Sequence, residues 1–397
     1  MKVKIGDICT LKSGTSLKED ILNESNGVPY IKVSDMNLVG NEKYIVRANS
    51  YVDESISEKM LFPKGTVLFP KRGGAIGTNK KRIASKAVCA DLNTMGVIPS
   101  DKIRPLYLYY FFQNIDFGTL YNGSSVPQIN NTDIAPMEIN LIPLEEQDNI
   151  VALLEKTDDI VRKRKEELSA LDDLIKARFV ELFGNPVLND KGWEQKFLGE
   201  ITSKIGSGAT PKGGKEAYQE DGITLIRSMN VHNGQFEYKD LAHISDEQAA
   251  KLDNVTIEKN DVLLNITGAS VARSCVVPNE ILPARVNQHV CIIRCMDCII
   301  PEFLNKLLID DNYQDLLWSI AGSGATREAI TKQQVENLQI ILPPLELQNQ
   351  FADFVHQVDK SKSIDTNIIP KGGFLQWKLI FHFLKKRGNM IYSQMHA

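Results

Sequence analysis

The sequence predicts an α+β fold in which two pseudo-symmetric mixed α/β domains are separated by long antiparallel coiled-coil helices. Three observations predict it: an apolar heptad pattern in mid-chain, a duplication on either side of that pattern, and an ordinary globular composition. The predicted boundaries are a first domain at 1–142, a central helix at 143–184, a second domain at 185–342, a shorter second helix at 343–364 and an atypical tail at 365–397.

The central helix is predicted from apolar residues that recur at every seventh position. One row is fully apolar and comprises Leu154, Val161, Leu168, Ile175 and Leu182. A second row is only partly apolar and comprises Ile150, Thr157, Arg164, Leu171 and Arg178. Pro143 suits the start of a helix and Gly184 its end, which gives a rod of about 60 Å at roughly 1.5 Å per residue. Its apolar row needs a partner helix, although an ordinary long core helix would also bury it.

The two domains are predicted to be copies of one another. Residues 64–77 align with 259–272, 28–37 with 223–230, and 4–16 with 196–210. Single positions continue the match into both helices: Ile129 with Ile330, Ile150 with Phe351, Leu154 with Val355, and Thr157 with Val358. The motif PLEEQ at 143–147 corresponds to PLELQ at 344–348. Because each copy ends in a helix, the two helices are natural partners, and antiparallel packing would relate the copies by a pseudo-twofold axis.

Within each domain, short β-branched and aromatic runs predict strands, as at 30–33 and 66–69. Four glycines punctuate a hairpin-like region at 65–77, and buried helices are predicted at 106–112 and 302–309. Beyond residue 364 the symmetry breaks, since Pro370 and two nearby glycines end any rod there. The segment 374–387 is either a short amphipathic helix or an out-of-frame tail.

The composition is that of a globular protein, with 43 % hydrophobic residues and a net charge of −4. No apolar run is long enough to span a membrane, and the N-terminal segment lacks the apolar core of a signal peptide. Six scattered cysteines predict a reduced, cytoplasmic chain. A nucleic-acid binder is usually basic, so here local charge or partner subunits would have to supply the attraction for phosphate.

Motifs for catalysis or metal binding are weak. The sequence at 206–215, GSGATPKGGK, fails the spacing of a phosphate-binding loop and is interpreted as a structural loop or a DNA-backbone contact. His289, Cys291, Cys295 and Cys298 fall within ten residues, yet a single CxxC without a second pair favours buried reduced thiols over zinc. We therefore predict no catalytic residues and no metal site.

The features that favour DNA binding are local. Lysines and arginines crowd a glycine-rich hairpin at 71–86, where a backbone without side chains could approach phosphate; a solvated loop is the alternative. The second copy has few charges there, and this asymmetry is typical of two different base readers, since Arg and Lys suit guanine while Asn and Gln suit adenine. The predicted DNA-binding residues are Lys71, Arg72, Asn79, Lys80, Lys81, Arg227, Asn230, Thr267, Arg273, Gln288 and Arg327.

Taken together, these motifs resemble the specificity (S) subunit of type I restriction–modification systems. In the second half the resemblance is carried by the segments at 207–211, 287–290, 322–330 and 343–348, with Tyr218, Gly222 and Ile223. Weaker versions stand at 13–16, 122–130 and 143–147, and LFGNP at 182–186 is similar to the family as well. The resemblance covers about residues 1–364. The departures are the tail and LNTMG at 92–96, where the second copy has VNQHV.

The resemblance implies a non-catalytic subunit with two target recognition domains, each reading half of a bipartite, asymmetric double-stranded DNA target. The helices would set the spacer between the half-sites and dock two modification (M) subunits, which carry S-adenosylmethionine and methylate adenine. Restriction (R) subunits that use ATP and Mg would join them; this chain itself would hold no cofactor and touch no membrane. The residues expected to form the spacer and docking helices are Ile150, Leu154, Val161, Leu168, Leu171, Ile175, Leu182, Phe351, Val355 and Val358. The alternative is a duplicated coiled-coil scaffold that binds protein rather than DNA.

Overall fold

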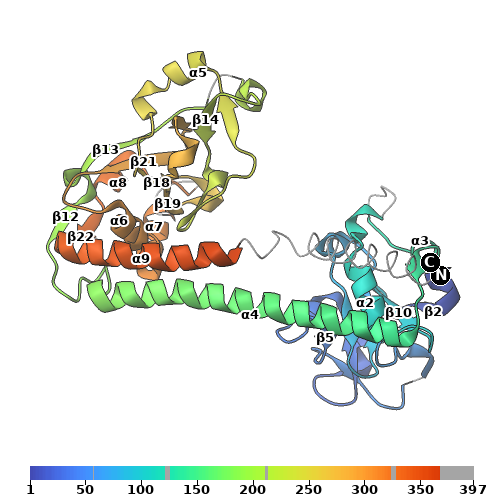
Figure 1. The fold of residues 1–397 in the computed structure, drawn as a ribbon. Helices are drawn as coiled ribbons and strands as arrows, with labels where there is room; N and C mark the ends of the chain where they lie inside the picture. Colours follow the sequence, from blue (N-terminus) through green and yellow to red (C-terminus); the bar gives the residue numbers. More distant parts are fainter. Residues whose placement is uncertain (57, 121–125, 211–212, 323–327, 367–397) are drawn as a thin grey trace, which may run out of the picture. The chain divides into compact units, whose positions relative to one another are not determined.

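The chain forms two compact units in the computed structural model, which describes residues 1–56, 58–120, 126–210, 213–322 and 328–366 (Figure 1). Unit 1 contains Met1–Lys165 and unit 2 contains Glu166–Asp365. The predicted tail lies outside the described residues except for Asp365 and Thr366.

Unit 1 is built from two sheets and a strand pair. The larger sheet has the order β2-β10-β7-β8-β5, the second sheet has the order β3-β6-β4-β9, and β1 pairs with β11. The strands are β1 (Lys2–Lys4), β2 (Cys9–Ser13), β3 (Leu22–Asn23), β4 (Val28–Ile31), β5 (Tyr44–Ile45), β6 (Tyr51–Val52), β7 (Val67–Pro70), β8 (Arg82–Ala84), β9 (Cys89–Ala90), β10 (Thr94–Pro99) and β11 (Glu138–Asn140). The helices are α1 (Ile5–Ile8), α2 (Pro105–Gln113), α3 (Asn131–Ile134) and the start of α4 (Leu144–Phe183).

Unit 2 repeats this plan. Its larger sheet has the order β13-β21-β18-β19, a second sheet has the order β17-β14-β20, and β12 pairs with β22. The strands are β12 (Gln195–Phe197), β13 (Thr202–Ser207), β14 (Ile223–Ile226), β15 (Val231–His232), β16 (Gln235–Phe236), β17 (Ala242–Ile244), β18 (Val262–Asn265), β19 (Ser274–Val276), β20 (Ala284–Val286), β21 (Val290–Cys295) and β22 (Gln339–Ile341). The helices are the end of α4, α5 (Asp246–Ala250), α6 (Pro301–Leu308), α7 (Asp311–Gly322), α8 (Lys332–Glu336) and α9 (Leu345–Thr366).

The alternation of apolar residues along a strand explains how the larger sheet of each unit contributes to a core on each of its two faces. On β18, Val262 and Leu264 belong to the core that includes α6, whereas Leu263 belongs to the core shared with β14 and β20. On β7, Val67 and Phe69 likewise pack with α2, whereas Leu68 faces the other core. Successive side chains of a strand point to opposite faces, so one apolar run covers both.

The predicted elements are present, with small shifts at their ends. The strand predicted at 30–33 ends at Ile31, because the Asp35 carboxylate accepts the Lys32 backbone N–H over 2.8 Å and turns the chain. The hairpin-like region at 65–77 contains β7 and most of a 3-10 helix at Gly74–Thr78, after which the chain returns as β8, the antiparallel partner of β7. The predicted buried helices are α2 and α6, each with a proline in its first turn.

Two buried glutamines hold the start of α4 and of α9 in the same way. Gln147 accepts the Arg104 backbone N–H over 2.8 Å and donates to the carbonyl of Ile142 over 2.8 Å. Gln348 accepts the Ile300 backbone N–H over 2.9 Å and donates to the carbonyl of Pro343 over 2.8 Å. This repeated set of hydrogen bonds explains why PLEEQ and PLELQ match between the copies.

Helix α4 contributes to the core of each unit at different residues. In unit 1 its buried residues are Val151 and Leu154, and in unit 2 they are Ile175, Phe179 and Phe183. The predicted row holds only in part: Val161 and Leu168 are half-buried and join neither core. The heptad count missed the two phenylalanines because a straight α-helix has 3.6 residues per turn, so a buried face drifts away from a seven-residue row.

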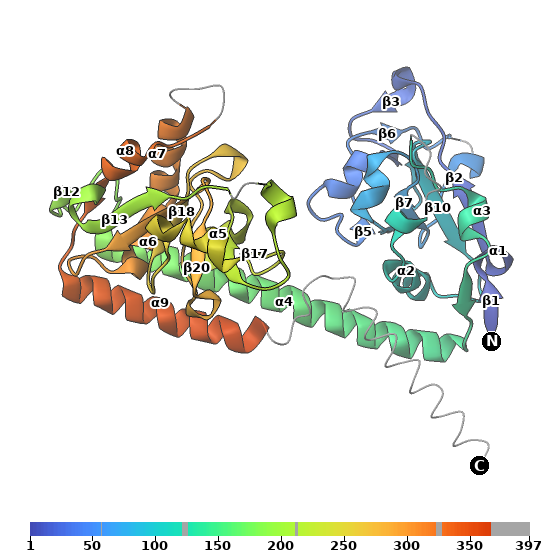
Figure 2. The same ribbon diagram turned by 90° about the horizontal axis from the view of Figure 1, so that it is seen from above.

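Helices α4 and α9 pack antiparallel within unit 2. The Phe351 ring, near the start of α9, lies 5.3 Å from that of Phe183, near the end of α4. Towards the end of α9, Lys362 donates to Asp172, eleven residues earlier on α4, over 2.6 Å. Both views show α9 lying along this part of α4 (Figures 1 and 2).

Candidate nucleic-acid interface

Two lysines of the basic hairpin are buried inside unit 1. The side chain of Lys71 donates to the Ser13 hydroxyl over 2.7 Å, and the residue is only 8 % exposed. Lys81 is fully buried, donates to the carbonyl of Ile115 over 2.7 Å and lies 4.3 Å from the ring centroid of Phe117. Burial lowers the pKa of Lys81 to about 7. The structure therefore contradicts the predicted DNA contacts of Lys71 and Lys81, because both ammonium groups serve the interior of the unit.

The other candidates in this hairpin differ in exposure. Asn79 adopts a left-handed backbone with φ of 54°, and its side-chain oxygen accepts the Phe117 backbone N–H over 2.9 Å, so it serves to close the turn. Lys80 is half-buried and donates to the side chain of Asn37. Arg72 is exposed, and it is the guanidinium at this end of β7 that a ligand can reach.

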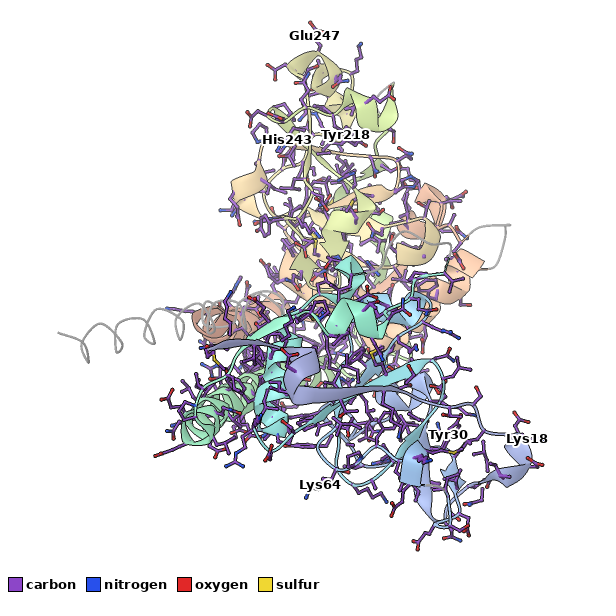
Figure 3. The ribbon with its side chains drawn as sticks, turned by 90° about the vertical axis from the view of Figure 1, so that its right-hand side faces the viewer. Lys18, Tyr30, Lys64, Tyr218, His243 and Glu247 are labelled. Atoms are coloured by element: carbon purple, nitrogen blue, oxygen red, sulfur yellow. The ribbon has the colours of Figure 1, made fainter. Side chains whose placement is uncertain are left out.

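In unit 2, Asn230 is a structural residue. It is fully buried, accepts the Arg227 backbone N–H over 3.1 Å and donates to the carbonyl of Glu237 over 3.0 Å. The predicted DNA contact of Asn230 is therefore contradicted. Arg227 is half-buried, with its guanidinium 5.3 Å from the ring centroid of Tyr218 and donating to the carbonyl of Asp240; Tyr218 is labelled in Figure 3.

Two predicted residues of unit 2 meet at one loop cluster. The hydroxyl of Thr267 lies 2.5 Å from Nδ1 of His289, and Nε2 of Gln288 lies 3.1 Å from Nε2 of the same ring. Gln288 is exposed, while Thr267 and His289 are half-buried. Arg273 is half-buried and remains a prediction, and Arg327 lies outside the described residues.

The loop cluster rests on a backbone frame that unit 1 repeats. The Ile266 N–H donates to the carbonyl of His289 over 3.0 Å, and the Lys71 N–H donates to that of Asn93 over 2.8 Å. A β-bridge then joins Thr267 to Ala329, as another joins Arg72 to Gln128. A glycine with φ near +70° follows in both copies, Gly268 at 72° and Gly73 at 71°. The equivalent positions are therefore Arg72 with Thr267, Asn93 with His289, and Gln128 with Ala329.

The frame corrects the sequence match at 92–96. The Asp91 N–H donates to the carbonyl of Ile31 over 2.9 Å, and the Asn287 N–H donates to that of Ile226 over 3.1 Å. Asp91 therefore corresponds to Asn287, which pairs VNQHV with residues 90–94 rather than 92–96. The shift concealed the exposed position Asn93, and His289 was considered only as a metal ligand. The equal spacing of each turn from the strand that follows would have given the right match.

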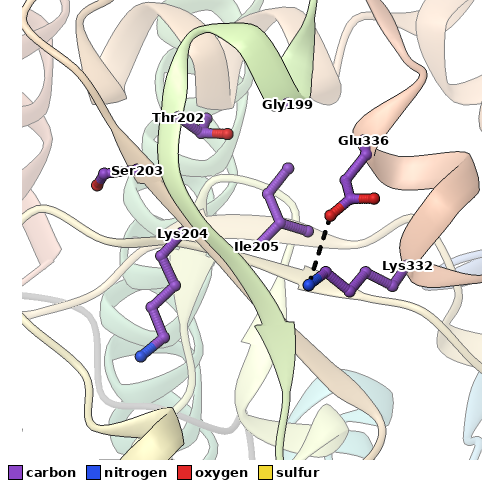
Figure 4. Close-up of a pocket in the computed structure, with 7 residues that line it drawn as sticks. All are labelled: Gly199, Thr202, Ser203, Lys204, Ile205, Lys332 and Glu336. Carbon is purple, nitrogen blue, oxygen red and sulfur yellow. Dashed lines mark ion pairs between the residues drawn. The ribbon is translucent and has the colours of Figure 1, made fainter.

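A surface depression of unit 2 was the other candidate for a functional site. A depression of about 300 Å³ is lined by Gly199, Thr202, Ser203, Lys204, Ile205, Lys332 and Glu336 (Figure 4). Lys332 and Glu336 of this depression form an ion pair at 3.4 Å on the surface of α8. This pair is not the combination of a nucleophile and a base that catalysis by an active site requires. Within the described ranges, no group of three or more His, Cys, Asp or Glu side chains could hold a metal ion, and no helix is long and apolar enough to cross a membrane.

All six cysteines lie in the described ranges and are free. Burial raises the pKa of Cys291 and of Cys295 to about 12, so both thiols stay protonated. They behave as small apolar side chains of β21, on which alternate residues face the core with the helices.

The two copies share one backbone frame but carry unlike side chains at its equivalent positions, as is typical of a duplicated recognition protein. A family model described as the type I restriction modification DNA specificity domain matches residues 1–170 and 190–371. The chain therefore belongs to this family, and its function is that of a DNA specificity subunit of a type I restriction–modification system.

Similar proteins agree with this assignment. The chain is 26 % identical over 383 residues to the type I restriction enzyme MjaIX specificity subunit of Methanocaldococcus jannaschii, covering 89 % of this chain and 85 % of that one. It is 22 % identical to the EcoBI specificity subunit of Escherichia coli, covering 90 % and 79 %. The fold is similar to a crystal structure of the S subunit from M. genitalium, with a TM-score of 0.52 at 14 % identity over 97 % of this chain and 94 % of that one. A structure from a study of type I complex assembly and conformational transition gives 0.54 at 19 % over 96 % and 95 %.

Proposed function

We propose that each domain reads one half of a bipartite, asymmetric double-stranded DNA target. The supporting observation is the repeated frame, on which Arg72 and Gln128 of unit 1 stand where unit 2 has Thr267 and Ala329. Unlike side chains at equivalent positions suit two unlike half-sites. A scaffold that binds only protein would have no reason to place reachable polar donors and acceptors at both copies of this frame. We assign the recognition domains to 1–142 and 185–342.

The distance between the half-sites is assigned to α4, paired with α9 as an antiparallel coiled coil. Between Leu154, buried in unit 1, and Leu171, which packs against the core of unit 2, the described part of α4 contributes no residue to either core. A change of length there leaves both domains intact. Each helical residue adds about 1.5 Å, and each base step spans about 3.4 Å.

We predict that deleting residues 161–164 shortens the preferred spacer by one or two base pairs and leaves both half-sites unchanged. Four helical residues amount to about 6 Å. Methylome sequencing of a strain that carries the whole complex measures the spacer directly. The matched control replaces the same four residues by alanine, which keeps the helix length and should keep the spacer. An unchanged spacer in the deletion strain contradicts the role of α4.

The helices are also assigned as the docking surface for two modification (M) subunits. Leu154, Ile175, Phe351, Val355 and Val358, predicted for docking, are buried within their own units and cannot reach a partner. Other apolar residues of α4 are exposed and share one face, seven and then fourteen residues apart: Leu153 at 49 %, Ile160 at 54 % and Leu174 at 47 %. An exposed apolar stripe on a helix is typical of a protein interface.

We predict that the double variant Leu153→Glu with Ile160→Glu loses the M subunits, because it places two charges in an apolar interface. Co-purification with tagged M subunit measures the loss, and circular dichroism checks that the chain folds. Ser169→Glu, on the opposite side of α4 and exposed, is the control and should retain the complex. Retention by the double variant would place the docking surface elsewhere.

In this proposal the chain catalyses nothing. Adenine methylation with S-adenosylmethionine is assigned to the M subunits, and ATP- and Mg-dependent cleavage to restriction (R) subunits of a cytoplasmic complex. The partners would also supply most phosphate contacts, which accounts for a DNA reader with a net charge of −4.

A further inference from the structure

At the end of β7, unit 1 presents an arginine beside two amides. Arg72 is exposed and is joined through a backbone bridge to Gln128. The Gln128 amide donates to Asn130 over 2.6 Å, and the exposed Asn93 amide donates to Asp91 over 3.0 Å. Each amide uses one of its two N–H donors in this way, whereas Arg72 offers the planar fork of donors that matches O6 and N7 of guanine.

Near the equivalent bridge, which joins Thr267 to Ala329, unit 2 presents Gln288, a glutamine held at both ends. The Thr210 hydroxyl donates to Oε1 of Gln288, and Nε2 of Gln288 lies 3.1 Å from Nε2 of His289. The other ring nitrogen of His289 lies 2.5 Å from the hydroxyl of Thr267. These contacts fit a neutral His289 that donates from Nδ1 to Thr267 and accepts from Gln288 at Nε2.

The count of hydrogen-bonding groups on Gln288 decides what it can read. A carboxamide has two N–H donors and two lone pairs on its oxygen. The contacts with His289 and Thr210 use one donor and one lone pair. One donor and one acceptor remain on an exposed side chain whose rotation is restrained. That pair complements N7 and the N6 amino group of adenine in the major groove.

Resting on the proposed function, we propose that Arg72 reads a guanine in one half-site and that Gln288 reads an adenine in the other. Thr210 and His289 are positioning residues that hold the Gln288 amide. The two readers stand beside equivalent backbone bridges, Arg72 to Gln128 and Thr267 to Ala329. One frame therefore presents guanine-reading chemistry in one copy and adenine-reading chemistry in the other.

Methylome sequencing of cells that carry the full complex tests this assignment through two variants. Arg72→Gln should weaken discrimination at one guanine of one half-site, and Gln288→Leu at one adenine of the other, each by on the order of ten- to a hundredfold. The remaining positions of the motif should not change. The matched controls are Lys64→Gln and Gln235→Leu, which make similar changes at other exposed residues and should keep the motif.

A second measurement needs no variant of the protein. Binding of the wild-type complex should weaken when 7-deazaguanine replaces the assigned guanine, and when 7-deazaadenine replaces the assigned adenine, because each analogue lacks the N7 acceptor. The variants Arg72→Lys and Gln288→Asn keep part of the hydrogen-bonding chemistry. Their base discrimination should therefore lie between that of the wild type and that of Arg72→Gln and Gln288→Leu.

The outcomes separate the two levels of the account. A wild-type complex without any bipartite motif contradicts the proposed function itself. A normal bipartite motif that neither variant alters, together with full binding of all deaza duplexes by the wild-type complex, overturns the assignment of Arg72 and Gln288 alone. Changes by both variants in the same half-site would also overturn it.

Discussion

The two units keep the same interior and differ at their exposed loops. Interior positions match in role even where the residue changes: Asp35 and Asn230 each cap the turn after an equivalent strand. Near the equivalent backbone bridges, by contrast, unit 1 exposes the cationic side chain of Arg72, whereas unit 2 exposes the neutral, hydrogen-bonded side chain of Gln288. The frame is held by backbone hydrogen bonds and buried side chains, so exposed residues can diverge with little effect on stability. Under the proposed function, specificity and stability are thus carried by different residues.

The largest expected effect tests whether the interiors are truly equivalent. Gln147→Leu and Gln348→Leu should each destabilise its unit by about 3 kcal/mol, because each leaves a buried backbone N–H and carbonyl groups without partners. Amide hydrogen exchange, resolved for each unit, measures the loss. The exposed neighbours Asn149→Leu and Asn349→Leu serve as controls with small effects. A large effect in one unit and none in the other would break the comparison.

A smaller effect is expected from the ion pairs that join α4 to each unit. In unit 1, Lys43 pairs with Glu155 of α4 at 3.2 Å and donates to Tyr110 Oη over 2.7 Å. In unit 2, Lys362 of α9 pairs with Asp172 of α4 at 2.6 Å. The carboxylates are more than a third exposed, so each Lys→Met change should cost only about 1 kcal/mol.

The same exchange measurement, repeated in 1 M salt, resolves these two contributions. Lys43→Met should cost slightly more, because its ammonium also lies 4.8 Å from the Tyr110 ring centroid. Salt should shrink the cost of Lys362→Met more, since that pair is the more exposed. If salt reduced the costs of Lys43→Met and Lys362→Met equally, the two ion pairs would not differ in exposure as described.

A further expected effect is a pH dependence of stability confined to unit 1. Burial lowers the pKa of Lys81 to about 7, whereas lysine in an unfolded chain titrates near 10.4. Between these values the unfolded state binds more protons, so this lysine makes the stability of unit 1 rise with pH. By strand register, unit 2 has Ser274 at the equivalent position. Lys81→Ser should therefore flatten the difference in stability between pH 7 and pH 9; an unaltered slope would contradict the low pKa.

The sequence predicted the parts of the fold that repeat. The PLEEQ and PLELQ motifs located both helix starts, and the match of 64–77 with 259–272 aligned β7 with β18 correctly. Periodicity failed inside α4, because its buried face changes along its length and Phe179 and Phe183 leave the seven-residue row. Local sequence does not encode which side of a long helix each unit covers.

The candidate interface was harder to predict for a related reason. Charge and loop position marked Lys71, Lys81 and Asn230, yet the fold buries all three. Whether a lysine in a glycine-rich hairpin points outward depends on what packs beneath it, and Phe117 and Ser13 come from distant parts of the chain. Gln288 and Thr267 were identified by type, but their contact with His289 required the structure.

The most direct measurement is the methylome of a strain in which this chain is the sole specificity subunit of its complex. Two unlike copies on one frame should yield methylated adenines within a target made of two different short sequences, separated by a fixed number of unspecified bases. A palindromic target, a single uninterrupted sequence, or methylation that does not depend on this chain would contradict the account.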